Sequence, residues 1–499
     1  MSEYDELPYP DALHEGTHID ALASRARLLG VRAPDPETAR VLEVGCAIGG
    51  NLIALASALP NATFVGLDRS TTQIAEADRR RRDLGVTNLR FEAADLLDVD
   101  ASWGEFDYIV AHGVFSWVPP DVADALLRLS ARLSPNGVMY VSYNVFPGWS
   151  DRIAIRELVV RHTANLPSPR QRVAQARQLL EFLARQSPPG AWAHDLERIL
   201  AEFHEHDDAY LFHEWLETHN HPQWFEDFVA RASAAGLRYL TDVQLPRVVP
   251  GNYGPEVDAT IGHMDELGTG RYLDFLGDRT FRQSLLVRAD VDIDRRMDAS
   301  RMREFRFSAR FSADGPPPAD GPWELHGRTG EFQASTPTAK AALAHLYAVR
   351  PERPSFDELV AVLPPESLDE KDLFETLLAC VLRDWVGLHV WRSPLVSAVR
   401  TRPKAWWLAR ELASGDAVPS LLHQNVRVGP LGELFLKQLD GKRSLEDIAR
   451  NLAKLEESGS LQVGWPGERP TSKRDRMVVL TALVENHVQS LAHLGLLVR

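Results

Sequence analysis

The sequence predicts an α/β protein in which a doubly wound, mostly parallel sheet is followed by a smaller α+β region. Three patterns support this prediction. Short apolar runs alternate with helical spacing over residues 41–144, helical spacing alone fills residues 150–215, and a unit of three helices and one strand recurs near the end. At 499 residues the chain is longer than one hydrophobic core usually serves, so we expect several domains.

Five apolar strands and three helices make up the expected sheet domain, residues 41–149. Because the strands alternate with helices, right-handed crossovers should place the strands parallel to one another. We expect strands at 41–44, 63–68, 89–95, 106–113 and 137–144, and helices at 51–59, 71–85 and 122–133.

The next region interrupts this alternation. Residues 150–222 show only helical spacing and are predicted to form a helical insertion that caps the ligand edge of the sheet. Residues 223–292 then complete the core, with a helix at 223–236, a second insertion at 244–283, and strands at 237–243 and 284–289.

The carboxy-terminal part begins with a strand-rich bridge and linker at residues 293–335, in which a Pro-rich stretch marks an exposed loop. Residues 336–499 then contain two similar units, at about 336–394 and 428–499, and each has a helix opened by a capping box. Three helices followed by a short strand is the winged-helix order, so we expect two tandem winged-helix-like units. A plain helical cap is the alternative.

Composition limits the classes of partner. The net charge of -15 and the pI near 5.6 argue against nucleic acid, because phosphate binding depends on clustered Lys and Arg. The only cysteines, Cys46 and Cys380, cannot build a disulfide framework. Since neither a secretory leader nor a run of about 18 apolar residues is visible, we expect a cytoplasmic protein that does not insert into membranes.

The most informative segment runs from Glu43 to Asn51 as EVGCAIGGN. A glycine-rich turn between a strand and a helix lets backbone N–H groups approach a ligand. Glu43 lies in the strand before this turn, where a carboxylate can accept hydrogen bonds from a ligand ammonium. Asp68 ends the second strand, where a carboxylate binds ribose hydroxyls. Asp95 ends the third strand and is placed for an adenine amino group.

Together these residues resemble the class I S-adenosylmethionine-dependent methyltransferases, whose core is a seven-stranded Rossmann-like sheet. The resemblance implies S-adenosyl-L-methionine as cofactor. One departure is Ala47, where the family more often has glycine, and a methyl group there would affect cofactor affinity. The implied cofactor-binding residues are Glu43, Gly45, Cys46, Ala47, Gly49, Asn51, Asp68, Arg69, Asp95, Leu96 and His112.

Further motifs resemble bacterial methyltransferases that carry a methyltransferase regulatory domain, including rickettsial-type protein lysine methyltransferases. These motifs are YDELPYP at the start, Thr17, His18 and Asp20, AHGVFSWVP (111–119), SYNVFPGW (142–149), FHEWLE (212–217) and RYLDFLGDRTFRQSLL (271–286). The resemblance also suggests that residues 1–40 form an amino-terminal lid, with Tyr4, Tyr9 and His18 folded over the cofactor.

The acceptor site is expected at the carboxyl ends of the fourth and fifth strands, the ligand edge of such sheets. The candidate catalytic residues are His112, Trp117, Tyr143 and Asn144, with Phe115, Ser116 and Trp149 nearby. His112 could act as a base, or it could form a hydrogen bond with a backbone group. Trp117 and Trp149 are alternatively packing or lid residues.

Two other clusters have simpler interpretations. The histidines between residues 204 and 221 fit no standard zinc spacing, so we expect a polar lid and no metal. The run of four arginines at 79–82 is expected to be the solvated face of a helix.

These observations predict an S-adenosylmethionine-dependent methyltransferase that acts on a protein or peptide lysine or amine. The acceptor remains open between protein, peptide and small molecule. Two alternatives are a natural-product N- or O-methyltransferase and a cofactor-binding scaffold without catalysis. The surplus of acidic residues on the catalytic side favours a cationic acceptor. A homodimer is possible.

Overall fold

The computed structural model describes Leu7 and residues 11–296, 299–462 and 472–499. The chain divides into two compact units. The first contains Met1–Ala12 and Arg25–Arg295, and the second contains Leu13–Ser24 and Arg296–Arg499. Helix α2 (Ile19–Leu28) begins in the second unit and ends in the first.

The first unit is built on a seven-stranded sheet with the strand order β3-β2-β1-β4-β5-β7-β6. Strands β1 to β5 pair in parallel, whereas β7 is antiparallel to both β5 and β6. The predicted α/β sheet is therefore confirmed, including its last two strands. The strands are β1 (Arg40–Val44), β2 (Thr63–Asp68), β3 (Leu89–Ala93), β4 (Phe106–Ala111), β5 (Leu133–Asn144), β6 (Leu237–Asp242) and β7 (Phe281–Arg288).

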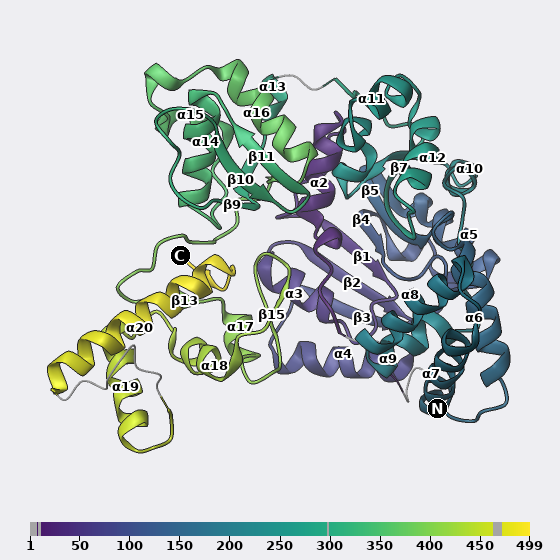
Figure 1. The fold of residues 1–499 in the computed structure, drawn as a ribbon, viewed down its shortest axis with the longest axis horizontal. Helices are drawn as coiled ribbons and strands as arrows, with labels where there is room; N and C mark the ends of the chain where they lie inside the picture. The colour runs from purple at the N-terminus through teal and green to yellow at the C-terminus, as the bar shows by residue number, and fades with distance from the viewer. Residues whose placement is uncertain (1–6, 8–10, 297–298, 463–471) are drawn as a thin grey trace. The chain divides into compact units, whose positions relative to one another are not determined.

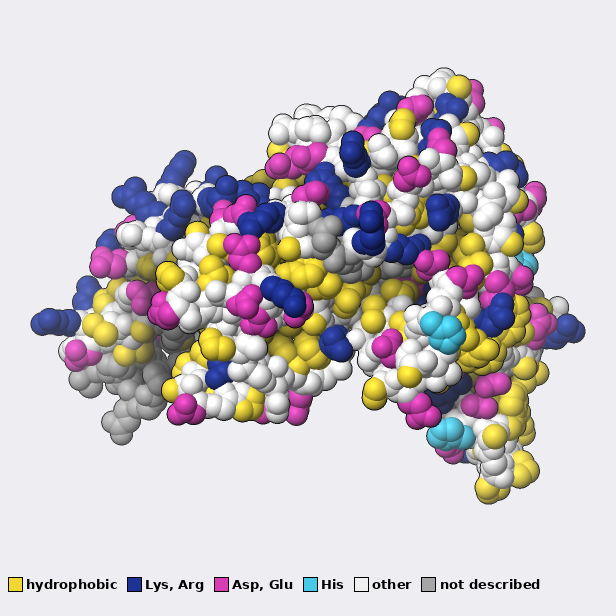
Figure 2. Space-filling model, turned by 90° about the horizontal axis from the view of Figure 1, so that it is seen from above, with side chains coloured by type: hydrophobic (Ala, Val, Ile, Leu, Met, Phe, Trp, Pro, Cys, Tyr) yellow, Lys and Arg dark blue, Asp and Glu magenta, His cyan; other side chains and the backbone are white. Residues whose placement is uncertain are grey.

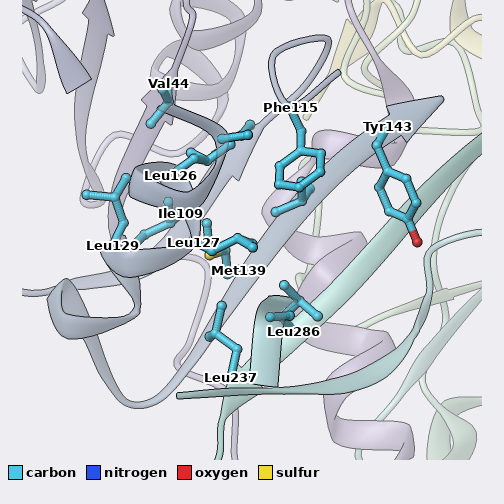
Figure 3. Packing of buried hydrophobic residues seen from close by; sticks show 14 of the residues in the cluster. Val44, Ile109, Phe115, Leu126, Leu127, Leu129, Met139, Tyr143, Leu237 and Leu286 are labelled. Atoms are coloured by element: carbon cyan, nitrogen blue, oxygen red, sulfur yellow. The ribbon is translucent and has the colours of Figure 1, made fainter. Parts of the chain in front are cut away.

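Helices connect these strands, as Figure 1 shows for α3 and α4 beside β1, β2 and β3. The sheet is hydrophobic on both sides because crossover helices cover parallel strands. One core cluster joins β4, β5 and α5 through residues such as Ile109, Met139 and Leu126 (Figure 3). The connecting helices are α3 (Gly50–Ala58), α4 (Thr71–Asp83), α5 (Pro120–Arg128) and α10 (Phe225–Ala234).

The segment between β5 and α10 is helical, as predicted. It has a hydrophobic cluster of its own, which includes Val173, Ile199 and Trp215 and also takes in Leu7 from the amino-terminal segment. Its elements are α6 (Ser150–Thr163), α7 (Pro169–Gln186), α8 (Ala191–Glu205), α9 (Asp208–Leu211) and the π-helix η5 (Phe212–Leu216).

The segment between β6 and β7 is the second insertion and is also helical. It consists of short turns and two helices, namely η6 (Leu245–Val248), η7 (Pro250–Tyr253), α11 (Pro255–Ile261) and α12 (Glu266–Leu276). Small turns elsewhere in this unit are η2 (Leu96–Asp98), η3 (Ala101–Trp103) and η4 (Leu129–Arg132).

The second unit begins with the turn η1 (Glu15–Thr17). After residue 296 it contains a first group of three helices, α14, α15 and α16, followed by the strand β12. The strand, β12, pairs antiparallel with β8, and Ser355 and Glu358 form the predicted capping box. The elements are α13 (Ala299–Met302), β8 (Arg306–Ala309), β9 (Phe311–Ser312), β10 (Trp323–Gly327), β11 (Gly330–Ala334), α14 (Pro337–Ala348), α15 (Phe356–Val362), η8 (Pro365–Ser367), α16 (Glu370–Leu382) and β12 (Val386–His389).

A second group of three helices, α18, α19 and α20, followed by the strand β16, lies at the end of the chain. Its last strand, β16, pairs with β13, and Ser444 and Asp447 form the second predicted capping box. The elements are β13 (Lys404–Ala405), α17 (Trp407–Glu411), β14 (Val418–Pro419), β15 (Asn425–Val426), α18 (Gly429–Gln438), α19 (Leu445–Glu457), α20 (Lys473–His493) and β16 (Leu497–Val498).

The amino-terminal segment predicted to form a lid is divided between the two units. Residues 13–24 belong to the second unit, where Asp20 is buried and pairs with Arg353 and His389. His18 stacks on Trp391 there, so it is held by that unit. Tyr4 and Tyr9 lie outside the described residues.

The described residues show neither a membrane-spanning helix nor a metal-binding cluster. None of their helices has both the length and the hydrophobicity needed to cross a membrane. In the same residues, no group of three or more His, Cys, Asp or Glu side chains could hold a metal ion. Figure 2 shows acidic and basic side chains intermingled over the face in view, with hydrophobic side chains between them.

Candidate active site

The loop between β1 and α3 bends sharply at the carboxyl end of the sheet. Gly45, Ala47 and Gly49 have φ angles of 74°, 48° and 77°, all in the left-handed region. Glycine adopts this conformation at little cost, but Ala47 strains the backbone by about 1 kcal/mol. Ala47, which stands where the family more often has glycine, therefore adopts the left-handed conformation that its neighbours Gly45 and Gly49 also adopt.

Asp68 fixes this loop from the end of β2. Its Oδ2 accepts a hydrogen bond from the Ala47 N–H at 3.0 Å, and its Oδ1 accepts one from the Ser70 N–H at 2.9 Å. Asp68 is half-buried and the next residue, Arg69, is exposed. The carboxylate therefore has a structural role in the loop, in addition to the predicted contact with a ribose.

Glu43 is buried beneath the loop with only part of its hydrogen-bonding capacity used. Oε1 accepts a hydrogen bond from Asn51 Nδ2 at 2.8 Å, while Oε2 has no hydrogen-bond partner among the described residues. Burial raises the pKa of Glu43 to about 7, and the nearby Asp11 carboxylate adds to this rise. A buried carboxylate with an unpaired oxygen is suited to a positively charged ligand group.

The other predicted cofactor residues surround the same loop. Cys46 is buried, and burial raises the pKa of its thiol well above the ordinary value, so it is a packing residue and not a nucleophile. Asp95 is exposed at the end of β3, and its Oδ1 caps the turn η2 by accepting a hydrogen bond from the Leu97 N–H at 2.9 Å. Leu96 is half-buried against the core.

The amino-terminal segment reaches this loop at Asp11, a residue that the sequence did not single out. Asp11 pairs with Arg80 at 2.6 Å, and Arg80 also donates to the Ile48 carbonyl at 3.1 Å. A side chain at Gly50 would collide with the Asp11 carboxylate in its present position, so it would displace Asp11 from the loop. Arg80 thus ties the described part of the amino-terminal segment to the loop, and the run of arginines is more than a solvated helix face.

His112 follows β4 and lies between two aromatic rings. Its Nδ1 is 2.8 Å from the Tyr140 hydroxyl, and its ring contacts Tyr140 and Phe281 with centroid separations of 5.9 and 5.8 Å. Burial raises the pKa of Tyr140, so this phenol stays neutral. His112 is half-buried, which leaves part of its ring accessible at the ligand edge.

The loop after β4 and the end of β5 are joined by hydrogen bonds. The Ser116 hydroxyl accepts one from the Asn144 N–H at 2.9 Å, and Asn144 Nδ2 donates to Asn220 Oδ1 at 3.0 Å. Trp117 is half-buried, and its ring packs edge-on against the buried Trp149 with centroids 6.5 Å apart. Asn144 and Trp117 therefore lie with His112 at the carboxyl edge, whereas Trp149 occupies a packing position.

Tyr143 is directed away from this group, so its predicted role in orienting the acceptor stays a prediction. Its side chain is 1% exposed, and its ring stacks on Phe228 with centroids 3.9 Å apart. In Figure 3 it lies beside Phe115 within the hydrophobic cluster. Its hydroxyl is 3.2 Å from that of Ser284 on β7, inside the sheet. The alternation of side chains along β5 directs Tyr143 into the core and leaves the edge to Asn144.

Comparisons with known proteins agree with this geometry. Family models match residues 42–139 as a methyltransferase domain, residues 207–288 as a predicted methyltransferase regulatory domain, and residues 401–496 as "PKMT, C-terminal winged helix domain". The last match confirms the winged-helix prediction for the final group of helices.

Proteins of rickettsiae are among those similar to this chain. An uncharacterized protein of Rickettsia prowazekii is 29% identical over 99% of this chain and 93% of its own length. A second uncharacterized protein of that species is 34% identical over 48% of this chain and 96% of its own length. The structure of PKMT2 from Rickettsia typhi, solved also in complex with AdoHcy, superimposes with a TM-score of 0.84 at 25% identity, covering 99% of this chain and 100% of the other.

The residues of the loop fit the cofactor that these matches imply. S-adenosylmethionine carries two positive charges, an ammonium and a sulfonium, and the unpaired carboxylate oxygen of Glu43 lies where a cation would satisfy it. The predicted cofactor, S-adenosyl-L-methionine, and the predicted family are both confirmed. The chain belongs to the S-adenosylmethionine-dependent methyltransferases that carry a methyltransferase regulatory domain and a carboxy-terminal winged-helix domain.

Proposed function

We propose that this enzyme methylates the side-chain nitrogen of lysine in a protein or peptide. The observation that carries the proposal is the likeness to PKMT2 over nearly the whole chain, together with the "PKMT" winged-helix match at residues 401–496. The likeness extends through both units, so it includes the regions outside the donor-binding sheet that are available to recognise an acceptor.

The distribution of lysine supports a lysine acceptor. Residues 1–300 contain no lysine, although they contain 29 arginines, and all seven lysines of the chain lie between Lys340 and Lys473. An enzyme that transfers methyl groups to lysine avoids modifying its own catalytic unit when that unit has none. The scarcity of lysine across the whole chain does not account for its complete absence from the first 300 residues.

The charge of the catalytic unit supports a cationic acceptor. Residues 1–300 have 45 Asp and Glu against 29 basic residues, whereas the rest of the chain is close to neutral. A negative potential raises the local concentration of cations and speeds their encounter with the site. A lysine ammonium fits this field, and an anionic acceptor does not.

The loop residues are proposed to hold the donor, which supplies a methyl group activated by its positively charged sulfur. Glu43 would bind the donor ammonium, Asp68 the ribose hydroxyls, and Asp95 the adenine amino group with Leu96 against the ring. The glycines and Ala47 allow the backbone to approach, Asn51 orients Glu43, and Asp11 with Arg80 closes the loop.

The acceptor side must supply two things. A lysine with an ordinary pKa of about 10.4 is protonated at pH 7, and deprotonating it costs roughly 4–5 kcal/mol at 1.36 kcal/mol per unit. The nitrogen must also be aligned with the methyl group while water is excluded. His112, Trp117 and Asn144 lie at the edge where this alignment would occur.

The proposal is tested with a methyl-labelled donor and a cell extract. A lysine acceptor predicts label in protein that mass spectrometry assigns to methylated lysine, and no label on residues 1–300 of the enzyme itself. Label only in a small-molecule fraction, or on oxygen, would overturn the proposal. Asp68→Ala, which removes both the ribose contact and the bond to the Ala47 N–H, should abolish the labelling and serves as the negative control.

A further inference from the structure

Two polar side-chain atoms in the loop between η5 and α10 are buried without a partner. Nδ2 of Asn220 and Nε2 of His221 have no hydrogen-bond partner in the part of the chain that the structure describes. A buried polar group left in this way costs about 1–3 kcal/mol, so each of these atoms needs a partner supplied by a ligand or by water.

This loop is fastened to the ligand edge of the sheet. The His221 N–H donates to the Ser116 carbonyl at 2.8 Å, and the Gln223 N–H donates to the Asn144 carbonyl at 2.9 Å. Asn220 Oδ1 accepts from the Asn144 side chain at 3.0 Å. These bonds reach the loop that follows β4 and the last residue of β5. The two unpaired atoms therefore lie beside the residues already placed on the acceptor side.

We propose that His221 is a catalytic residue whose Nε2 takes the proton from the acceptor lysine, and that Asn220 Nδ2 binds a carbonyl oxygen of the acceptor chain. The inference rests on the proposed function. In the step, the lysine N–H bond breaks and its proton moves to His221 Nε2. The freed nitrogen lone pair then forms the bond to the methyl carbon, and the electron pair of the breaking C–S bond remains on sulfur.

The charges around His221 suit this role. Burial lowers its pKa, and the neighbouring His219 and the positive charges of Arg156 of α6 and Arg231 of α10 lower it further. His221 is therefore neutral at pH 7 and has a lone pair to accept a proton. The same positive groups disfavour a lysine ammonium at this place, so they lower the pKa of the acceptor as well.

The test compares His221→Ala and His221→Asn with the control His263→Ala, which removes an exposed histidine from the turn after α11. The acceptor is the protein labelled by wild-type enzyme in the extract experiment, and AdoHcy binding by calorimetry verifies that each variant is folded. We expect both His221 variants to bind AdoHcy as wild type does but to transfer methyl groups 10²–10⁴-fold more slowly at pH 7. His263→Ala should stay within a few fold of wild type.

The pH profile separates a proton acceptor from a residue that only supports the loop. Without His221 the rate should rise about tenfold per pH unit up to high pH, whereas the wild-type rate should level off, and added imidazole should restore part of the His221→Ala rate. Wild-type and variant rates that are equal, or reduced with parallel pH profiles, would overturn the inference while leaving lysine methylation intact. A wild-type enzyme that labels no lysine would instead overturn the proposed function, and the inference with it.

Discussion

Two buried carboxylates, one in each unit of the molecule, differ in how completely they are paired. Asp20 uses both oxygens: Oδ1 accepts from the Val390 and Trp391 N–H groups, and Oδ2 accepts from Arg353 and lies 2.8 Å from His389 Nδ1. Glu43 has one bond from a neutral amide and one oxygen with no partner among the described residues.

The difference appears in their protonation. The charge of Arg353 and the hydrogen bonds from His389 and two backbone N–H groups outweigh burial and hold the pKa of Asp20 below its usual range. Nothing comparable offsets burial at Glu43, whose pKa is raised to about 7. A fully paired carboxylate stabilises the fold, whereas an underpaired one is left for a ligand.

The Asp20 cluster also shows why geometry alone does not define a catalytic site. Ser308, His389 and Asp20 are linked by contacts of 2.8 Å in the order of a Ser-His-Asp triad. Arg353 and burial keep His389 neutral, with a pKa lowered to about 3, and both Asp20 oxygens are already used. The cluster therefore holds residues 13–24 in the second unit, and breaking it tests stability and not activity.

The largest effect is expected from Asp20→Asn, which keeps the shape of the side chain but leaves Arg353 buried without its counter-charge. Breaking a buried ion pair in this way costs about 3–5 kcal/mol, so the denaturant midpoint of the second unit should fall sharply. The control is Asp290→Asn, which removes the exposed partner of Arg288 and should leave the midpoint unchanged. Equal midpoints for the two variants would show that Asp20 does not stabilise the fold.

Glu43→Gln should have the opposite pattern, with the fold kept and the ligand lost. Removing the charge from an underpaired site leaves stability equal or higher, but AdoHcy should bind about 10–100-fold more weakly, because its ammonium loses a charge-assisted hydrogen bond. Calorimetry and thermal unfolding give the two readouts. Glu105→Gln, exposed just before β4 at the opposite edge of the sheet, is the control, and undiminished affinity in Glu43→Gln would contradict the assignment.

The pH dependence of stability and of AdoHcy affinity should reveal the raised pKa of Glu43. Because the folded pKa of Glu43 is raised, the stability that its protonated form contributes is full below about 4.5 and is lost as pH rises through about 7. Donor binding needs the ionised form, so AdoHcy affinity should fall up to about tenfold between pH 7 and 6. Glu43→Gln should flatten this dependence, and a profile of unchanged slope would assign it to another group.

The sequence predicted the sheet well because its signals are local. Apolar runs gave each strand, and the carboxylates Asp68 and Asp95 were found because they directly follow strands. The packing of Tyr143 on Phe228 could not be predicted, because strand ends do not reveal which face a side chain takes and both faces of β5 are covered. Asp11 and Asn220 reach the site from distant segments through side-chain contacts and His221 through its backbone N–H, and Asp20 joins residues more than 330 positions away. No periodicity encodes such contacts.

The smallest effect concerns the loop above Glu43. Ala47 has φ at 48°, so Ala47→Gly should relieve backbone strain and raise the free energy of unfolding by up to about 1 kcal/mol, less the added entropy of the unfolded chain. Ala54→Gly in the interior of α3, where no positive φ is needed, should instead lower it by about 0.5–1 kcal/mol. Thermal unfolding with and without AdoHcy would show whether Ala47→Gly changes the stability of the free and the AdoHcy-bound protein by the same amount. A larger gain with AdoHcy means that the methyl group holds the loop away from the ligand, whereas destabilisation by Ala47→Gly would mean that the alanine contributes packing that outweighs its strain.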